Sequence, residues 1–284
     1  MSILDTTTRR ASPARAWLVT LGIAIVALLV NLPFLTALAA SFKTTAAINR
    51  NPLSLPFGAD ATLEHYENAL YAAGYDFSRF FMNSTIIAVV TVIVVLLISV
   101  PAAYAMVRFN LGGRYLLYGV AGLRLLPPIF FVLPLFAMFT QWRIIDSLWA
   151  MIIVDVFLNI PIVVVLLTRA IAELPIEIEE AAQVDGASTL RTLTTVVVPL
   201  LAPSMVAAAV ITFLFTWNDY LFAVVMTTTN ARTVTVGATN FITSAGVLWG
   251  DISAITVMSV GIPILLAIFA QRYLVSGLAA GAVK

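Results

Sequence analysis

The sequence predicts an all-α membrane protein in which six transmembrane helices are joined by loops, one of them a long helical loop on the cytoplasmic side. Hydrophobic residues make up 61% of the chain and charged residues only 10%, against about 45–50% and about 25% in soluble domains. Several apolar runs reach the roughly 20 residues that span a hydrocarbon core. One long polar segment, Glu173–Pro203, separates two of these runs and carries five acidic residues.

The six expected spans must be helical, because lipid offers no partner to a free backbone group. Prolines in or near the spans predict kinks, and the sharpest break is expected at Pro127-Pro128. The spans are placed at Trp17–Ala40, Phe80–Met106, Tyr115–Phe139, Leu148–Leu167, Pro203–Val225 and Ile252–Val275. We expect one transmembrane domain, residues 17–284, which includes the loop 173–203 and follows a cytoplasmic segment, residues 1–16.

Lys and Arg orient the spans, because cytoplasmic loops carry an excess of both. If both termini are cytoplasmic, the inside segments hold Arg9, Arg10, Arg15, Arg108, Arg114, Arg169, Arg191, Arg272 and Lys284. The outside segments then hold only Lys43, Arg50, Arg79, Arg143 and Arg232. The alternative of a signal peptide cleaved near Ala37-Leu38-Ala39 is less favoured, because the apolar run exceeds a usual signal core.

Composition excludes several kinds of chemistry. The absence of cysteine excludes thiol catalysis and cysteine metal sites, and a net charge of +1 without a basic patch gives no reason to expect nucleic acid. The single histidine, His65, lies in a polar loop, where we expect it to be solvated. Neither lysine follows the Gly-rich turn of a P-loop, so the chain itself should not bind ATP. We expect no metal, no cofactor and no enzyme activity in this chain.

The segment Glu173–Pro203 contains the start and stop signals of two short helices. Pro175 can occupy the first turn of a helix, and acidic residues follow at the positive end of its dipole. Asp185-Gly186 should stop this helix, with glycine in the left-handed conformation. Ser188 can cap a second helix, Thr189–Val198, which Pro199 is expected to end. A merely solvated connection is the alternative, but such connections are usually about four to six residues long.

The motifs of this loop match the EAA loop of permease subunits of ABC importers. They are Glu180-Ala181-Ala182, Asp185-Gly186-Ala187, Val196, Val198-Pro199-Leu200 and Pro203, with Val198 where the family usually has Ile or Leu. Further matches are Ser41-Phe42-Lys43, Asn83-Ser84, Tyr104-Ala105, Arg108-Phe109, Pro127-Pro128, Asn159-Ile160-Pro161 and Trp217-Asn218-Asp219. The chain therefore resembles an ABC-importer permease, and its tail, Gln271 to Lys284, is similar to the maltose-type second permease of the carbohydrate-uptake branch.

The resemblance implies the permease fold, with the loop as a coupling helix that docks on an ATPase. It assigns this contact to Glu179, Glu180, Ala181, Ala182, Asp185, Gly186 and Ala187, and a C-terminal contact to Gly281 and Lys284. The implied partners are a second permease in a heterodimer, an ATPase dimer that binds ATP and Mg, and an extracytoplasmic substrate-binding protein. The implied cargo is a sugar, either a di- or an oligosaccharide, and the implied location is the bacterial cytoplasmic (inner) membrane.

Several polar residues fall inside the expected spans, where charge is costly and usually faces the protein interior. A translocation path could use Arg124, Asp155, Trp217, Asn218 and Asp219, because sugars pair with aromatic faces and polar groups. Alternatively, Arg124 and Asp155 form a structural pair, Arg124 reaches a partner subunit, or Asp155 is wet near the outer end of its span. The polar residues after Trp217 could instead bond helix to helix.

A different class of transporter also uses intramembrane acids. An ion-coupled secondary transporter could employ Asp155 and Asp219, with broken helices at Pro127-Pro128. This alternative leaves the EAA-like loop unexplained.

Overall fold

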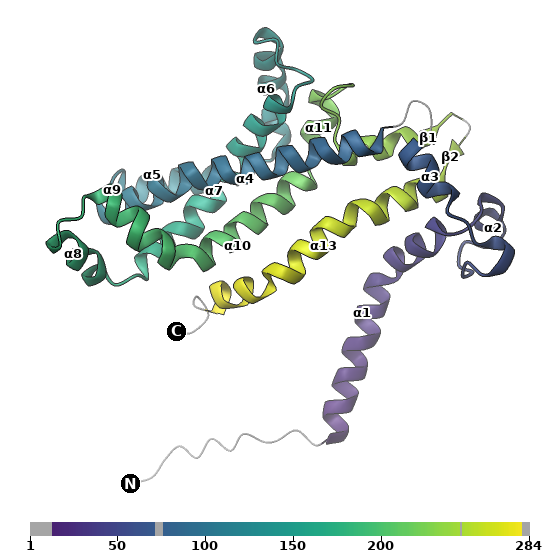
Figure 1. The fold of residues 1–284 in the computed structure, drawn as a ribbon, viewed down its shortest axis with the longest axis horizontal. Coiled ribbons are helices and arrows are strands. Elements are labelled where there is room, and N and C mark those ends of the chain that lie inside the picture. Colours follow the sequence, from purple (N-terminus) through teal and green to yellow (C-terminus); the bar gives the residue numbers. More distant parts are fainter. Residues whose placement is uncertain (1–12, 72–75, 245, 280–284) are drawn as a thin grey trace.

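The computed structural model describes residues 13–71, 76–244 and 246–279, and within these the chain is almost wholly helical (Figure 1). Five helical stretches are long and apolar enough to cross a membrane. They are α1 (Pro13–Ser41), α4 (Phe77–Arg108), α7 (Leu148–Ala172), α10 (Val198–Trp217) with the helical turns that precede it, and α13 (Trp249–Ala279). The prediction of an all-α membrane protein is confirmed.

The third predicted span is divided rather than continuous. Its two parts are α5 (Gly113–Leu123) and α6 (Ile129–Gln141), and the break contains Pro127 and Pro128, as predicted. Each part is shorter than a membrane-spanning helix, so the count of six spans is not confirmed by helix length. Pro134 lies within α6 and Pro161 within α7.

The predicted end of a helix at Pro199 is wrong. The chain is helical from Thr189 to Trp217, through α9 (Thr189–Thr192), a π-helical turn η2 (Leu193–Val197) and α10. In the π turn the N–H of Val198 bonds to the carbonyl of Leu193. Because the bond spans five residues instead of four, the register of the backbone hydrogen bonds shifts just before Pro199, which has no N–H to donate. The helix therefore continues past Pro199. The helix ends at Trp217 and resumes as α11 (Leu221–Met226).

The bundle is built on α4, which packs along α7 and α10 (Figure 1). One apolar cluster, here called the outer cluster, joins α4, α6, α7, α11 and α12 (Val234–Gly237) and includes Ile87, Val154 and Phe222. A second, the inner cluster, joins α4, α7, η2 and α10 and includes Val95, Val163 and Leu201. The two clusters occupy opposite halves of the bundle.

Helix α1 stands apart from the bundle. It meets α13 near its C-terminal end and diverges from the other helices toward its N-terminal end (Figure 1). None of its most apolar stretch is buried within the chain, and Val30 is 72% exposed. A cavity of about 610 Å³ is lined by α1, α2 and the start of α13, and its walls include Ala40, Ile48 and Trp249. An apolar helix left this bare must be covered by lipid or by another protein.

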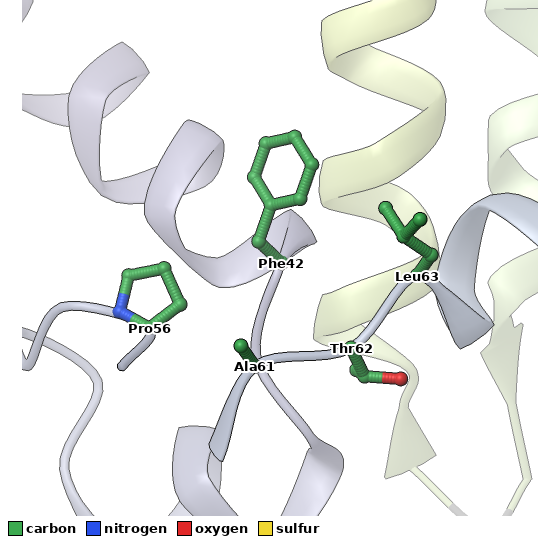
Figure 2. A pocket seen from close by; sticks show the side chains of 5 residues that line it. All are labelled: Phe42, Pro56, Ala61, Thr62 and Leu63. Carbon is green, nitrogen blue, oxygen red and sulfur yellow. The ribbon is translucent and has the colours of Figure 1, made fainter. Parts of the chain in front are cut away.

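The segment between α1 and α4 folds as a small cap on the start of α13. It contains α2 (Thr45–Arg50), a 3₁₀ turn η1 (Gly58–Asp60) and α3 (Glu64–Tyr71). Buried Lys43 donates to the carbonyls of Asn51, Pro52 and Ser54 at 2.6, 3.2 and 3.0 Å. An open depression of about 480 Å³ lies where the two backbone segments at Lys43 and Ala61 cross (Figure 2).

The prediction that His65 is solvated is wrong. Its ring is buried, with Nδ1 2.8 Å from Asp251 Oδ1 and Nε2 2.8 Å from the Lys43 carbonyl. A Cβ on Gly250 would overlap the ring, so glycine at this position gives the histidine its space. The segment that carries His65 folds back on α13. The hydrogen-bond partner of the ring is therefore Asp251, which is distant in sequence.

The remaining elements lie at the same end of the bundle as this cap (Figure 1). They are a 3₁₀ turn η3 (Ala238–Phe241) and a two-strand hairpin of β1 (Ile242–Thr243) and β2 (Gly246–Val247). The loop 173–203 lies at the opposite end, with α8 (Ile176–Val184) at its tip (Figure 1).

Candidate functional site

The tip of the loop 173–203 is a helix closed by a glycine turn, as the sequence predicts. Gly186 has a φ of +85°, the left-handed region that favours glycine. Its N–H bonds to the Gln183 carbonyl at 2.9 Å, and the N–H of Ala187 bonds to the Ala182 carbonyl at 3.0 Å. The Ser188 hydroxyl then caps the next helix by accepting from the N–H of Arg191. Pro175 is the residue before α8 rather than part of its first turn.

The exposed face of this turn is small and partly apolar. Val184 is 87% exposed and Leu190 is 70% exposed, although both are apolar. Among the residues of the predicted ATPase contact, Glu180, Ala181, Asp185 and Gly186 are exposed, and Ala182 and Ala187 are half-buried. Exposed apolar side chains beside small residues are a feature that protein–protein contact surfaces share.

Glu179 differs from the rest of the predicted contact set, because its side chain points into the bundle. It is 3% exposed, and its carboxylate accepts from Arg108, with Oε1 2.8 Å from Nε and 2.7 Å from Nη2. The other oxygen accepts from the Tyr104 hydroxyl at 2.8 Å. Charge-assisted bonds of this kind are the strong ones. Glu179 therefore fixes the turn to α4 instead of presenting a charge to solvent.

Arg108 extends this attachment to a third element. Its Nη2 also donates to the carbonyls of Ile171 and Leu174, at 3.1 and 3.0 Å, at the C-terminal end of α7. One guanidinium thus joins the ends of α4 and α7 and the start of the loop. Sequence reasoning noted Arg108 only as a cytoplasmic charge and as part of a motif, although its position at a span end beside an acidic loop was the available signal.

The middle of the bundle buries several of the predicted path residues. Asp155 is 2% exposed, so the alternative that it is wet is wrong. Trp217 is 4% exposed and stacks on Phe213 with ring centroids 5.5 Å apart, while Phe81 meets its edge. Asp219 follows the end of α10 and is half-buried, whereas Asn218 is exposed. Trp217 is packed into the core and offers no free face to a sugar.

Arg124 lies at the break between α5 and α6 and is exposed. Its Nη1 donates to the Leu158 carbonyl at 3.0 Å, and its guanidinium lies 4.8 Å from the centroid of the Phe215 ring. The described residues form three ion pairs, Arg50–Asp60, His65–Asp251 and Arg108–Glu179. The alternative of a structural Arg124–Asp155 pair is therefore wrong. The guanidinium borders a cavity of about 230 Å³ whose walls include Phe131 and Phe157.

At the opposite end, Asp146 organises a loop that sequence reasoning missed. Its carboxylate accepts from the backbone N–H groups of residues 228 to 231, at 2.9 to 3.2 Å. Burial alone would raise the pKa of this carboxyl, but the four backbone N–H groups outweigh burial and hold the pKa well below its usual range. The acid was not conspicuous in the sequence, because its partners lie more than 80 residues away.

The Asn83-Ser84 pair, a weak motif in the sequence, holds the same loop from α4. Asn83 Nδ2 donates to the carbonyls of Asn230 and Arg232, at 2.9 and 3.0 Å. The Ser84 hydroxyl accepts from the N–H of Val234 at 3.0 Å. The loop 227–234 is thus bound to α4 and to the connection between α6 and α7. Gly281 and Lys284, the predicted C-terminal contact, lie outside the described residues.

A buried core of long apolar helices, with an exposed and internally anchored helical turn at one end, defines a polytopic membrane protein. The chain matches, over residues 98–279, the family described as "Binding-protein-dependent transport system inner membrane component". The chain belongs to this family.

Curated relatives align over nearly the full chain. The trehalose/maltose transport system permease protein of Thermococcus litoralis is 33% identical, covering 94% of this chain and 96% of the relative. The arabinooligosaccharides transport system permease protein of Halalkalibacterium halodurans is 30% identical, covering 97% and 99%. The trehalose transport system permease protein of Mycobacterium tuberculosis is 33% identical, covering 89% and 92%. These relatives are named as transport subunits rather than as enzymes.

A solved structure shares the fold. A chain of a bacterial ABC transporter involved in the import of the acidic polysaccharide alginate aligns with a TM-score of 0.77 at 21% identity, covering 94% of this chain and 99% of that chain. A structure of a bacterial alginate ABC transporter in complex with an alginate pentasaccharide-bound periplasmic protein aligns with a TM-score of 0.65. The fold is that of an ABC-importer permease.

Proposed function

We propose that this chain is one permease of an ATP-driven importer and that its cargo is a sugar, a di- or oligosaccharide. The observation that carries the proposal is the turn of α8 and Gly186, which presents small residues outward while Glu179 binds it to α4. The names of the relatives, which transport trehalose, maltose or arabinooligosaccharides, support a sugar.

In this mechanism the ATPase acts on the bundle through the turn. ATP and Mg would be bound by an ATPase dimer, whose closure on ATP would carry the docked α8 with it. Because Arg108 contacts α8, α7 and α4 together, the displacement would pass to the helices that line the bundle. The spans would then exchange inward-open and outward-open states, each favoured by a different ligand. Glu180, Ala181, Ala182, Asp185, Gly186 and Ala187 would form the contact, and Glu179 would position it.

A second permease is the natural partner of α1. Its apolar length is unburied within the chain and exceeds what one contact with α13 covers. In a heterodimer this helix would pack on the other permease, and the exposed faces of α5 and α6 would border a shared path. Arg124, Phe215, Asn218 and Tyr220 have exposed side chains, and the Arg124 guanidinium lies over the Phe215 ring. These are the residues we propose for sugar contact. Asp155 and Trp217, which are buried, would support the path from behind.

The opposite end of the bundle would receive the extracytoplasmic binding protein. Asp146 and Asn83 fix the loop 227–234, so this loop would offer the binding protein an ordered surface. Exposed tryptophans would lie at the two membrane boundaries, with Trp142, Trp149 and Trp249 at this end and Trp17 at the other. With the excess of Lys and Arg at the loop 173–203 end, both termini would be cytoplasmic.

An ion-coupled secondary transporter is not favoured, because membership of a binding-protein-dependent family leaves no need for it. The proposal is tested by gentle detergent purification of the chain from its native membrane, followed by mass spectrometry. We expect an ATPase, a second permease and a binding protein to copurify. Reconstituted with ATP and the binding protein, the complex should accumulate sugar inside vesicles, and uptake should survive collapse of ion gradients. Uptake by the chain alone, driven by such a gradient, would contradict the proposal.

A further inference from the structure

A pocket lies at the end of the bundle that carries the loop 173–203, where three helices meet. Its volume is about 280 Å³, and it is open at the molecular surface. The last turns of α4 and α7 form two walls, with Met106, Val107 and Arg169, and the start of α5 forms the third, with Leu117. The residues proposed above for the ATPase contact and for the sugar path do not line this pocket.

The pocket is positively charged, because Arg169 is not neutralised by a neighbour. The residue is exposed, and its guanidinium forms no hydrogen bond or ion pair with the described residues. A basic residue in the last turn of a helix often bonds to the final carbonyls, but here Arg108 already donates to those of Ile171 and Leu174. No acidic side chain lines the pocket. Within the described part of the chain, the Arg169 guanidinium is therefore left to bind an anion.

Asn110 supplies a second donor to the same pocket. It lies in the turn between α4 and α5 with a φ of +51°, a left-handed conformation that asparagine tolerates. Its amide is exposed and forms no hydrogen bond with the described residues. The planar guanidinium can donate two parallel bonds to phosphate oxygens, and the amide can donate a third. The first turn of α5 contains no acidic residue that would oppose a negative ligand.

The remaining walls of the pocket are largely apolar. Met106, Val107 and Leu117 are half-buried and line it beside Arg169. A phosphate ion alone would leave these side chains in water, whereas an anion that carries a hydrocarbon chain would cover them. Tyr118, the neighbour of Leu117, is 66% exposed, and tyrosine is enriched where transmembrane helices meet the membrane surface. The combination favours an amphipathic anion at this boundary.

We propose that this pocket binds the head group of an anionic phospholipid. Arg169 and Asn110 hold the phosphate, and Met106, Val107 and Leu117 contact the start of an acyl chain. Basic pockets between transmembrane helices bind anionic head groups in this manner. The site lies at the ends of membrane-spanning helices, so the ligand reaches it from the adjacent leaflet of the bilayer.

The bound lipid would connect the start of α5 to the ends of α4 and α7. Val107 of the pocket precedes Arg108, which already joins α4 and α7 to Glu179 of α8. The lipid would therefore add α5 to the helices that are held together at this end. The site requires neither ATP nor cargo, so it stands independently of the proposed function.

The experiment uses the purified complex in phosphatidylcholine nanodiscs that contain a photoactivatable phosphatidylglycerol. After illumination, mass spectrometry of peptides should place cross-links in residues 106–117 and 168–172. Unlabelled phosphatidylglycerol should compete, and equal amounts of phosphatidylcholine or of inorganic phosphate should not. In Arg169→Gln the phosphatidylglycerol content that half-saturates this labelling should rise at least about tenfold, as expected for the loss of a charge-assisted bond. Arg191→Gln, at an exposed arginine of the same end but outside the pocket, is the matched control and should label as the wild type does.

Two further variants separate the phosphate contact from general attraction between charges. Arg169→Lys keeps the charge and should retain more labelling than Arg169→Gln. Leu117→Trp keeps every charge but fills the apolar part of the pocket, so labelling should fall. The proposal is overturned if Arg169→Gln labels as strongly as the wild type, if phosphatidylcholine competes equally, or if the two segments carry no cross-links. Competition by inorganic phosphate would also overturn it, and would indicate a site for a soluble anion.

Discussion

Arg108 and Glu179 are 71 positions apart in sequence and form a two-contact ion pair, with Oε1 2.8 Å from Nε and 2.7 Å from Nη2. The side chains are 12% and 4% exposed, so the pair is shielded from water and its interaction is little screened. Because Arg108 is the last residue of α4 and Glu179 lies in the middle of α8, the pair connects the two helices directly, and the Tyr104 hydroxyl of α4 bonds to the same carboxylate.

Breaking this pair should separate ATP hydrolysis from transport. Removing one partner of a buried ion pair costs about 3–5 kcal/mol, and in Arg108→Ala the cost falls on the attachment of α8. We expect sugar uptake by the reconstituted complex to fall at least about tenfold, while ATP hydrolysis persists. Glu177→Gln, on the exposed side of the same helix, is the matched control and should leave both activities unchanged. Equal loss of hydrolysis and uptake in Arg108→Ala would argue against a coupling role.

A side chain at Gly186 should reduce transport, because of the backbone conformation at this position. Its φ of +85° is unfavourable for other residues by about 1–2 kcal/mol, although a Cβ would meet no neighbouring atom within the chain. Gly186→Asp should therefore insert and fold but lose transport, and a bulky residue at the half-buried Ala182 should do the same. Gly261→Ala, in the middle of α13 with open space around it, is the control. Normal uptake by both coupling-turn variants, measured in vesicles, would remove the turn from the mechanism.

Acid should loosen the loop that Asp146 holds. The pKa of this carboxyl is lowered in the folded state, so its contribution to stability is complete above the unfolded value of about 3.9 and is lost as pH falls below it. We expect amide hydrogen exchange at residues 228–231 to accelerate as pH is lowered through about 4, after correction for the intrinsic rate. In Asp146→Ala exchange there should be fast already at neutral pH. An unchanged protection pattern in that variant would contradict the assignment.

The cap on α13 depends on the space left by Gly250. Gly250→Ala would force the buried His65 ring from its place between Asp251 and the Lys43 carbonyl, and overpacking of this kind costs about 1–3 kcal/mol. The thermal midpoint of the purified chain should fall, with proteolysis appearing first in residues 41–71. Gly119→Ala, at a helical glycine with no neighbour within 4 Å, should be neutral. Equal midpoints for the two variants would show that the cap is not under this constraint.

Features governed by local sequence were predictable. Apolar length defines the long helices, Pro127-Pro128 breaks the third segment, and Gly186 closes α8, because each depends on the residues in place. Pro199 misled the prediction because a π turn upstream supplies the hydrogen-bond shift that lets a helix accept proline.

Features that depend on distant partners were not predictable. His65 is buried because Asp251 lies 186 positions away, and Glu179 turns inward because Arg108 is there to receive it. The alternative of an Arg124–Asp155 pair is wrong for the same reason, since the guanidinium contacts the Leu158 carbonyl and the Phe215 ring instead. Sequence patterns give the type of each side chain, while its partner is decided by the packing of the helices.

The helical run from Thr189 to Trp217 reaches from the loop 173–203 to the break before α11. Its 29 residues, at a rise of about 1.5 Å each, form a rod of about 43 Å. A tilt of about 10° at the Gly186 end would sweep the far end by about 7 Å on this rod length, more than the diameter of a helix backbone. Asp219 and the break before α11 lie at that far end. Under the proposed coupling, a small rotation at the loop 173–203 would become a displacement of several ångströms at the break before α11.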